Sequence, residues 1–289
     1  DLTGGIQVTG NYIGKARTAD ELRADLDFAM KYIPGVKKVN LHANYQESDK
    51  FVDRDEIRPE HFKQWADWAV ERNIGLDFNP TYFSHPKSDN GTLSAADDKV
   101  RDFWVKHGIA CRKIGQYFHE RTGKICVINH WTSDGSKEIP QDTLSPRLRL
   151  KDSYDRIFKE TSDVKGVVDG IESKLFGIGL ESYTTGSFEF CIGYVMNKKK
   201  DHIILTLDTG HYHPTEVVSA KLSGIFTFQK SLLLHVSRPV RWDSDHVVSF
   251  DDETKAIFEE LVKMNKLKNT YVATDYFDAS INRVMAWAV

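Results

Sequence analysis

The chain has 289 residues, of which 40% are hydrophobic and 28% are charged, the composition of a globular protein with a large buried core. With 39 basic and 42 acidic residues the formal net charge is −3, so the sequence lacks the positive field that drives nucleic-acid binding. No apolar run approaches the length of about 18 residues that a membrane-spanning helix needs. We therefore expect neither a nucleic-acid nor a membrane partner.

Cysteine use points to a reducing compartment. The three cysteines form an odd set without a CxxC pair, which argues against a disulfide framework and favours the cytoplasm. The sequence opens at Asp1 without Met and stops at Val289 inside an apolar run. We expect residues 1–289 to be one domain and an internal portion of a longer polypeptide.

Strand-length apolar runs alternate with segments of helical periodicity along the whole chain. The predicted strands are 39–43, 76–80, 126–131, 167–173, 203–208, 232–236 and 271–276. The predicted helices are 18–32, 59–72, 96–121, 145–160, 213–223 and 251–266. The first of them opens on a capping box of Thr18 and Glu21. The glycine-rich segment before the first strand is predicted to be a loop.

Strict alternation of strand and helix predicts a parallel sheet with helical crossovers. Seven strands are one short of an eight-stranded barrel. We therefore predict an α/β fold of the (β/α)₈ TIM-barrel type, with the first strand and C-terminal helices outside this chain. An open, doubly wound sheet is the alternative.

Metal-ligand side chains follow four consecutive predicted strands. The carboxyl ends of barrel strands form one face, where the catalytic residues of barrel enzymes lie, so these side chains should meet there. The residues are Glu172 and Lys174, then Asp208 and His211, then His235, Asp243 and Asp245, and finally Asp275. If residues 243–245 are extended, Asp243 and Asp245 point the same way, as Glu172 and Lys174 do.

Five carboxylates at one barrel mouth would repel one another, and one lysine cannot offset them. Two divalent cations together with Lys174 would offset the five negative charges. This oxygen-rich set with two imidazoles suits Mn²⁺, Mg²⁺, Co²⁺ or Zn²⁺. Taken singly, the same residues have structural explanations. Asp275 could cap a helix, His235 could be a satisfied core histidine, and Asp208 with His211 could lie on the surface.

Two further side chains are candidates for the same mouth. Trp131 ends a predicted strand and offers an indole face for the apolar side of a sugar, although core or lid packing explains it as well. His85 follows the strand at 76–80 and brings an imidazole near the mouth, where an ordinary loop role is the alternative.

Six segments resemble L-rhamnose isomerase: 1–12, 76–86, 172–187, 207–217, 232–248 and 275–283. The resemblance implies a first metal held by Glu172, Asp208, His235 and Asp275. It implies a second, catalytic metal held by His211, Asp243 and Asp245, with Asp208 bridging. Lys174, His211 and Asp243 would be catalytic, and Trp131, His85 and Lys174 would contact the substrate.

The resemblance also implies conversion of L-rhamnose to L-rhamnulose by a metal-assisted hydride shift, with proton abstraction through an enediol as the other course. We expect two divalent cations per chain, Mn²⁺ at the catalytic position with Zn²⁺, Co²⁺ or Mg²⁺ as alternatives, and a homotetramer. One departure is Ala95, which stands where the family pattern has a histidine for ring opening. A nearby group such as His85, or a water molecule, would then open the ring.

Two other functions compete with an isomerase. A metal-dependent hydrolase on a similar barrel would need cationic or amide groups for a phosphate and more histidine ligands. A metal-stabilised sugar-binding protein without turnover would keep the ligands, and Ala95 is compatible with it.

Overall fold

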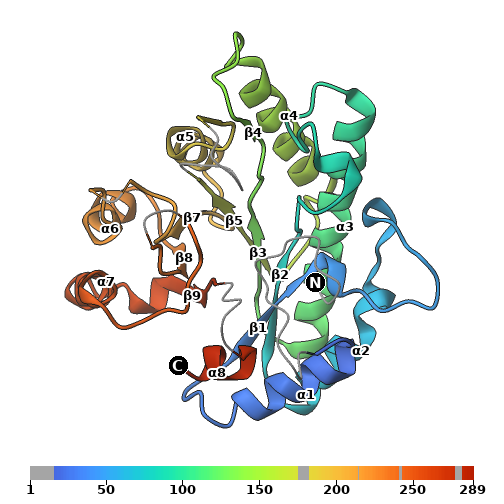
Figure 1. Ribbon diagram of the computed structural model, residues 1–289, viewed down its shortest axis with the longest axis vertical. Helices are drawn as coiled ribbons and strands as arrows, with labels where there is room; N and C mark the ends of the chain where they lie inside the picture. The colour runs from blue at the N-terminus through green and yellow to red at the C-terminus, as the bar shows by residue number, and fades with distance from the viewer. Residues whose placement is uncertain (1–15, 175–181, 214, 241–242, 277–281) are drawn as a thin grey trace.

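The computed structural model describes residues 16–174, 182–213, 215–240, 243–276 and 282–289. Seven parallel strands curve around a common axis and helices lie outside them (Figure 1). The strands are β1 (Lys38–His42), β2 (Gly75–Asn79), β3 (Cys126–His130), β5 (Val167–Glu172), β7 (Ile203–Asp208), β8 (Leu232–Val236) and β9 (Thr270–Thr274). The seven predicted strands are thus confirmed.

The strand order distinguishes a barrel from an open, doubly wound sheet. The order is β1-β2-β3-β5-β7-β8-β9, so each strand pairs in parallel with the next long strand along the chain. A doubly wound sheet reverses direction at a switch point, and this order has no reversal. The fold is therefore a nearly closed α/β barrel. Within the described part of the chain, β1 and β9 are its edge strands.

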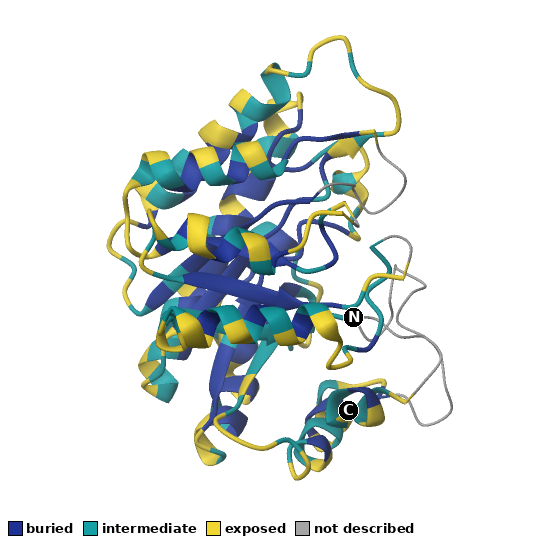
Figure 2. Ribbon diagram, turned by 90° about the vertical axis from the view of Figure 1, so that its left-hand side faces the viewer, coloured by how far each residue is buried: buried dark blue, intermediate teal, exposed yellow. Residues whose placement is uncertain are grey.

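Eight α-helices are present among the described residues, and their exposed faces point outward (Figure 2). The strands β3, β5, β7 and β8 are buried, whereas the edge strands β1 and β9 are partly exposed. They are α1 (Ala19–Ala29), α2 (Lys63–Glu71), α3 (Asp98–Thr122), α4 (Ser145–Glu160), α5 (Phe188–Lys198), α6 (Ser219–Phe226), α7 (Asp252–Lys263) and α8 (Arg283–Ala288). The capping box of α1 is confirmed: Glu21 N donates to Thr18 Oγ1, and Thr18 N donates to the Glu21 carboxylate, both at 3.2 Å. No helix in these ranges is long and apolar enough to cross a lipid bilayer.

Several elements differ from the sequence-based expectation. Helix α5 was not predicted because its aromatic and β-branched residues lack a polar face, and it begins where the Ser187 hydroxyl accepts from Phe190 N. A two-residue antiparallel pair, β4 (Gly135–Ser136) with β6 (Tyr183–Thr184), is too short to leave a pattern. Single 3₁₀ turns lie at Ala43–Tyr45, Arg54–Glu56, Pro59–Phe62, Pro86–Ser88 and Leu267–Asn269. The predicted glycine-rich loop lies outside the described residues.

The barrel interior becomes polar toward the carboxyl ends of the strands. Side chains two apart on a strand share a face, so Ile204, Thr206 and Asp208 of β7 all point inward. At the amino ends, Ile204 packs with Val127 and Leu233 in an apolar cluster. The strands therefore carry the ligand-type side chains at one mouth, above an apolar plug.

A buried ion pair joins the outside of the sheet to α3. Arg112 Nε and Nη2 donate to Asp169 Oδ1 and Oδ2 at 3.0 and 3.1 Å, and Arg112 Nη1 donates to Thr161 O at 2.7 Å. His130 Nε2 also lies 3.0 Å from Asp169 Oδ1. Burial raises the pKa of Asp169, but His130 and Arg112 outweigh it and hold that pKa below its usual value. This pair stays charged inside the fold.

We expect Arg112→Met to lower the free energy of unfolding by about 3 to 5 kcal/mol, because it leaves the Asp169 carboxylate buried without its guanidinium. Urea denaturation measures the change. The matched control is Arg156→Met, which removes an ion pair with Asp102 at 2.6 Å. The two side chains of that pair are 35% and 52% exposed, so its loss should lower the free energy of unfolding by only about 0 to 1 kcal/mol. Equal losses in the two variants would contradict the prediction.

Candidate metal centre

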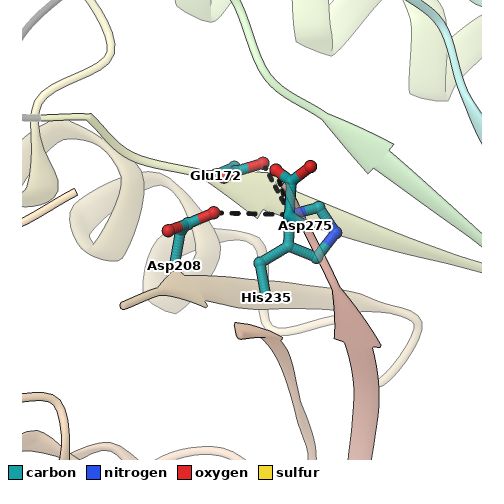
Figure 3. A group of neighbouring side chains, drawn as sticks. All are labelled: Glu172, Asp208, His235 and Asp275. Atoms are coloured by element: carbon teal, nitrogen blue, oxygen red, sulfur yellow. Dashed lines mark ion pairs between the residues drawn. The ribbon is translucent and has the colours of Figure 1, made fainter. Parts of the chain in front are cut away.

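One group of ligand-type side chains gathers at the carboxyl ends of four adjacent strands (Figure 3). Glu172 ends β5, Asp208 ends β7, His235 lies in β8 and Asp275 follows β9. His235 Nδ1 lies 3.4 Å from Asp275 Oδ2, 3.5 Å from Glu172 Oε2 and 3.7 Å from Asp208 Oδ2. Each residue offers one ligand atom, and the four atoms lie within 4.8 Å of one another. This is the spacing of donors around a shared cation.

A second group shares Asp208 and adds His211 and Asp243. His211 Nε2 lies 3.4 Å from Asp243 Oδ2 and 3.8 Å from Asp208 Oδ2. His211 Nδ1 lies 2.8 Å from Ser173 O. A carbonyl oxygen can only accept, so Nδ1 carries the proton and donates it, which directs the other ring nitrogen to the two carboxylates.

Buried atoms in these groups lack hydrogen-bond partners. Among the described residues, no hydrogen bond reaches Glu172 Oε1, Asp208 Oδ2, His235 Nδ1 or Asp243 Oδ1. Glu172 Oε1 lies 3.1 Å from His211 Nδ1, but that N–H is directed to Ser173 O. A buried polar atom without a partner is costly. Four such atoms on residues of the two groups fit ligands that complete their coordination with divalent cations.

The electrostatics of the cluster lead to the same conclusion. Burial raises the pKa of Asp208 to about 8, with the Glu172 carboxylate adding to the rise and His211 opposing it. Burial and the carboxylates of Asp275, Asp243 and Asp208 raise the pKa of Asp245 to about 9. Burial alone would lower the pKa of His211, but Asp208 and Asp243 outweigh it and raise it to about 10. The mouth thus has more negative charge than the protein itself neutralises.

The turn after β7 positions His211 against Asp243. Asp208 Oδ1 accepts from Gly210 N at 2.7 Å, and Ser237 N donates to Thr209 Oγ1 at 2.7 Å, which ties this turn to the end of β8. A Cβ atom on Gly210 would lie 2.7 Å from Ser237 Oγ and 2.8 Å from Asp243 Oδ1. Only glycine allows the two loops to approach this closely.

Lys174 and Trp131 lie beside the second group. Lys174 Nζ lies 2.5 Å from Asp243 Oδ2 and 4.4 Å from the centre of the Trp131 ring. Trp131 also packs edge-on against Phe83 at 5.3 Å and lies 6.4 Å from the His211 ring. The structure therefore brings the predicted lysine, the predicted tryptophan and the ligand-type residues to one mouth.

Asp245 lies near the groups but not in the expected arrangement. Its backbone is left-handed, with φ 45°, so residues 243–245 are not extended, and the condition under which Asp243 and Asp245 would point the same way is not met. Its Oδ1 lies 3.5 Å from Ser237 Oγ. Among the described residues it belongs to neither ligand group.

His85 turns away from the ligand groups. Its Nε2 lies 2.9 Å from Asp53 Oδ1, its Nδ1 accepts from Lys87 N at 3.1 Å, and its ring stacks on Phe103 at 5.2 Å. Both ring nitrogens are thus engaged elsewhere. No hydrogen bond, ion pair or ring contact among the described residues joins His85 to either group, so its contact with a substrate stays a prediction.

The loop that carries Ala95 is rigidly anchored. Thr92 and Ser94 each donate a backbone N–H and a hydroxyl to the Asp134 carboxylate, at 2.7 to 2.9 Å. Arg101 Nη1 donates to Ala95 O at 2.7 Å, and Ala95 is buried. The sequence analysis assigned no role to Asp134 or to Asn129. For Asn129 a signal was available, because it is a polar residue inside a buried, largely apolar strand.

The fold and this mouth define a class: α/β barrels with carboxylates and histidines at the carboxyl ends of the strands. Solved structures share the fold. A D-psicose 3-epimerase matches with a TM-score of 0.62 at 13% identity over 87% of this chain and 79% of its own. An L-ribulose 3-epimerase matches with a TM-score of 0.62 at 13% identity over 97% of this chain and 83% of its own.

Within this class the chain belongs to the L-rhamnose isomerase family, whose members are aldose–ketose isomerases. The family model described as L-rhamnose isomerase (RhaA) matches residues 1–289. The L-rhamnose isomerase of Mannheimia succiniciproducens is 55% identical over 288 residues, and that of Escherichia coli (strain SMS-3-5 / SECEC) is 55% identical over 289. Both matches cover 100% of this chain and 68% of the relative.

We expect Gly210→Ala to weaken Mn²⁺ binding about tenfold or more, because the added methyl group displaces Asp243 from His211. Isothermal titration of the chelator-treated protein measures the change. The control is Gly224→Ala in α6, where a Cβ atom would meet no described atom within 4 Å. This substitution should stabilise the helix by about 0.5 to 1 kcal/mol and leave Mn²⁺ binding unchanged. Unchanged Mn²⁺ affinity in Gly210→Ala would refute this account of the turn.

Proposed function

We propose that this chain is a metal-dependent aldose–ketose isomerase that converts L-rhamnose to L-rhamnulose at a two-cation site. The observation that carries the proposal is the pair of ligand groups sharing Asp208, with buried unpartnered donor atoms in both. Membership of the L-rhamnose isomerase family supports the substrate.

Glu172, Asp208, His235 and Asp275 would hold the first cation. Asp208, His211 and Asp243 would hold the second, with Asp245 within electrostatic range of Asp243 as a further candidate. Mostly carboxylate donors with one imidazole in each group favour Mn²⁺, with Co²⁺, Mg²⁺ or Zn²⁺ as alternatives.

When bound, the cations would neutralise the carboxylates and polarise the sugar oxygens at C1 and C2. The chain's own residues then bind and orient the sugar. Lys174 Nζ is the proton donor nearest the second group and would hydrogen-bond a reacting sugar oxygen. Trp131 would cover the apolar face of the sugar and exclude water.

We expect hydrogen to move from C2 to C1 as hydride, while the C2 hydroxyl proton is lost and the C1 oxygen gains one. Trp131 and Phe83, each 9% exposed, limit the access of solvent beside the second group. In the enediol course, hydrogen leaves C2 as a proton and can exchange.

Two alternatives have less support. A phosphodiester hydrolase would need several cationic side chains for the phosphate, and the two groups at the mouth instead have an excess of carboxylates. A binding protein without turnover shares the ligands, so it is distinguished by assay. It predicts cation and sugar binding with no product.

The proposal is tested with chelator-treated protein reloaded with Mn²⁺ and incubated with L-rhamnose deuterated at C2. We expect L-rhamnulose only with the cation, and deuterium retained at C1 by NMR. Cation-dependent product with the label lost would replace the hydride shift by the enediol. No product from protein that binds two Mn²⁺ per chain would overturn the isomerase and leave the binding protein.

Asp243→Asn should abolish turnover while the fold is retained, because it weakens one donor of the second group and the partner of Lys174. Product formation and far-UV circular dichroism measure the two effects. The control is Asp201→Asn, whose side chain is 73% exposed in a surface pair with Lys230 and which should be fully active. Wild-type turnover with full cation content in Asp243→Asn would disprove its assignment.

Glu172→Gln should reduce the stabilisation that Mn²⁺ gives. Saturation to about 100 times Kd stabilises a folded protein by about 2.7 kcal/mol, so the wild-type Tm should rise on adding Mn²⁺ and the variant's much less. The control is Glu216→Gln, an exposed change that should keep the full rise. The same rise in Glu172→Gln and wild type would contradict a ligand role for Glu172.

We also propose that residues 1–289 act as one barrel domain, as a homotetramer in the cytoplasm. The three cysteines are buried and unpaired, which supports a reducing compartment. Light scattering coupled to size exclusion tests the tetramer.

A further inference from the structure

A polar bridge beside Glu172 crosses the barrel interior and joins β3 to β7. In the strand register, Asn129 of β3 pairs with Gly170 of β5, and Glu172 of β5 pairs with Thr206 of β7. Asn129 Nδ2 donates a short hydrogen bond to Glu172 Oε2, and Thr206 Oγ1 donates to Asn129 Oδ1 at 2.9 Å. An amide accepts only through oxygen and donates only through nitrogen, so the two bonds fix its orientation.

Gly170 makes this bridge possible. Asn129 and Thr206 lie on the two strands that flank β5, so their side chains must meet above position 170. A Cβ atom there would overlap Thr206 Oγ1 and lie 3.4 Å from Asn129 Oδ1. Because Gly170 has no side chain, the hydrogen bond between Thr206 and Asn129 occupies the space above it.

The bridge treats the two oxygens of Glu172 differently. Oε2 accepts from Asn129, whereas no hydrogen bond from a described residue reaches Oε1. Asn129, Glu172 and Thr206 are almost fully buried, so water does not compete for these positions. Asn129 is neutral, so it orients the Glu172 carboxylate without neutralising it. The carboxylate keeps its full negative charge for a cation.

We infer that Asn129 is a positioning residue of the first cation position: it orients the Glu172 carboxylate and is itself held by Thr206 across Gly170. The inference rests on the proposed function, because it assigns Asn129 to the cation that Glu172 would hold. Hydrogen-bonding groups behind a metal ligand typically change metal affinity 10- to 100-fold when removed.

A purely structural bridge would lower stability without changing cation affinity, so both are measured. Thr206→Val keeps the shape and removes the hydroxyl that holds the amide, and Asn129→Leu removes the amide at similar volume. The control is Ile204→Val, which lies two residues before Thr206 on the same face, in the apolar cluster with Val127 and Leu233, and removes no polar group of the bridge. Mn²⁺ binding is followed by electron paramagnetic resonance, and Tm is measured in chelator.

We expect both bridge variants to weaken one of the two Mn²⁺ positions about 10-fold or more, with the number of ions at saturation unchanged. Ile204→Val should keep the wild-type affinities while its Tm in chelator falls about as far as that of Thr206→Val. If Asn129→Leu does not fold, Thr206→Val still decides the question.

Wild-type Mn²⁺ affinities in Thr206→Val would overturn the inference and leave the proposed function intact. A wild-type protein that binds no Mn²⁺ would overturn both, and the wild-type titration separates these two failures.

Discussion

The burial of carboxylates at the carboxyl ends of β5 and β7 is the constraint on which the rest of the mouth depends. Removing an anion from water is unfavourable unless positive charge or protons compensate. In the protein alone, burial raises the pKa of Asp208 to about 8, while the carboxylates of Asp208 and Asp243 raise that of His211 to about 10. Divalent cations would replace those protons, so the same geometry that is costly alone becomes favourable when loaded.

The barrel supports this mouth in layers. An apolar cluster that includes Ile204 and Leu233 closes the amino end of the interior, and the Asn129–Thr206 bridge lies above it. The carboxylates of Glu172 and Asp208 come last. Because side chains two apart on a strand share a face, β7 alone carries the order from the apolar Ile204 to the hydroxyl of Thr206 to the carboxylate of Asp208. Glu172, Asp208 and His235 therefore stand on strands, Asp275 directly follows β9, and His211 and Asp243 lie on the loops above them.

Sequence patterns predicted the strands and the residues that end them, since parallel strands bring their carboxyl ends together whatever the loops do. They do not give the direction of a side chain where that direction depends on a distant partner. The His85 ring contacts Asp53, 32 residues earlier, and Asp245 has a left-handed backbone that no periodicity reveals. Helix α5 was missed because its apolar composition resembles a strand, and tertiary packing decided its form.

Strand β5 carries two buried acids that meet different environments. Asp169 faces outward, where the Arg112 guanidinium supplies fixed positive charge and donates to both carboxylate oxygens, and His130 Nε2 lies 3.0 Å from Oδ1. Glu172, three residues later, faces inward, where Asn129 supplies a neutral donor and Oε1 stays without a hydrogen-bond partner from the described residues. The same strand thus neutralises one carboxylate with the protein's own cation and leaves the other for an exchangeable one. The Asp169 carboxylate therefore stabilises the fold through its ion pair with Arg112, whereas the Glu172 carboxylate is available to the proposed cation site.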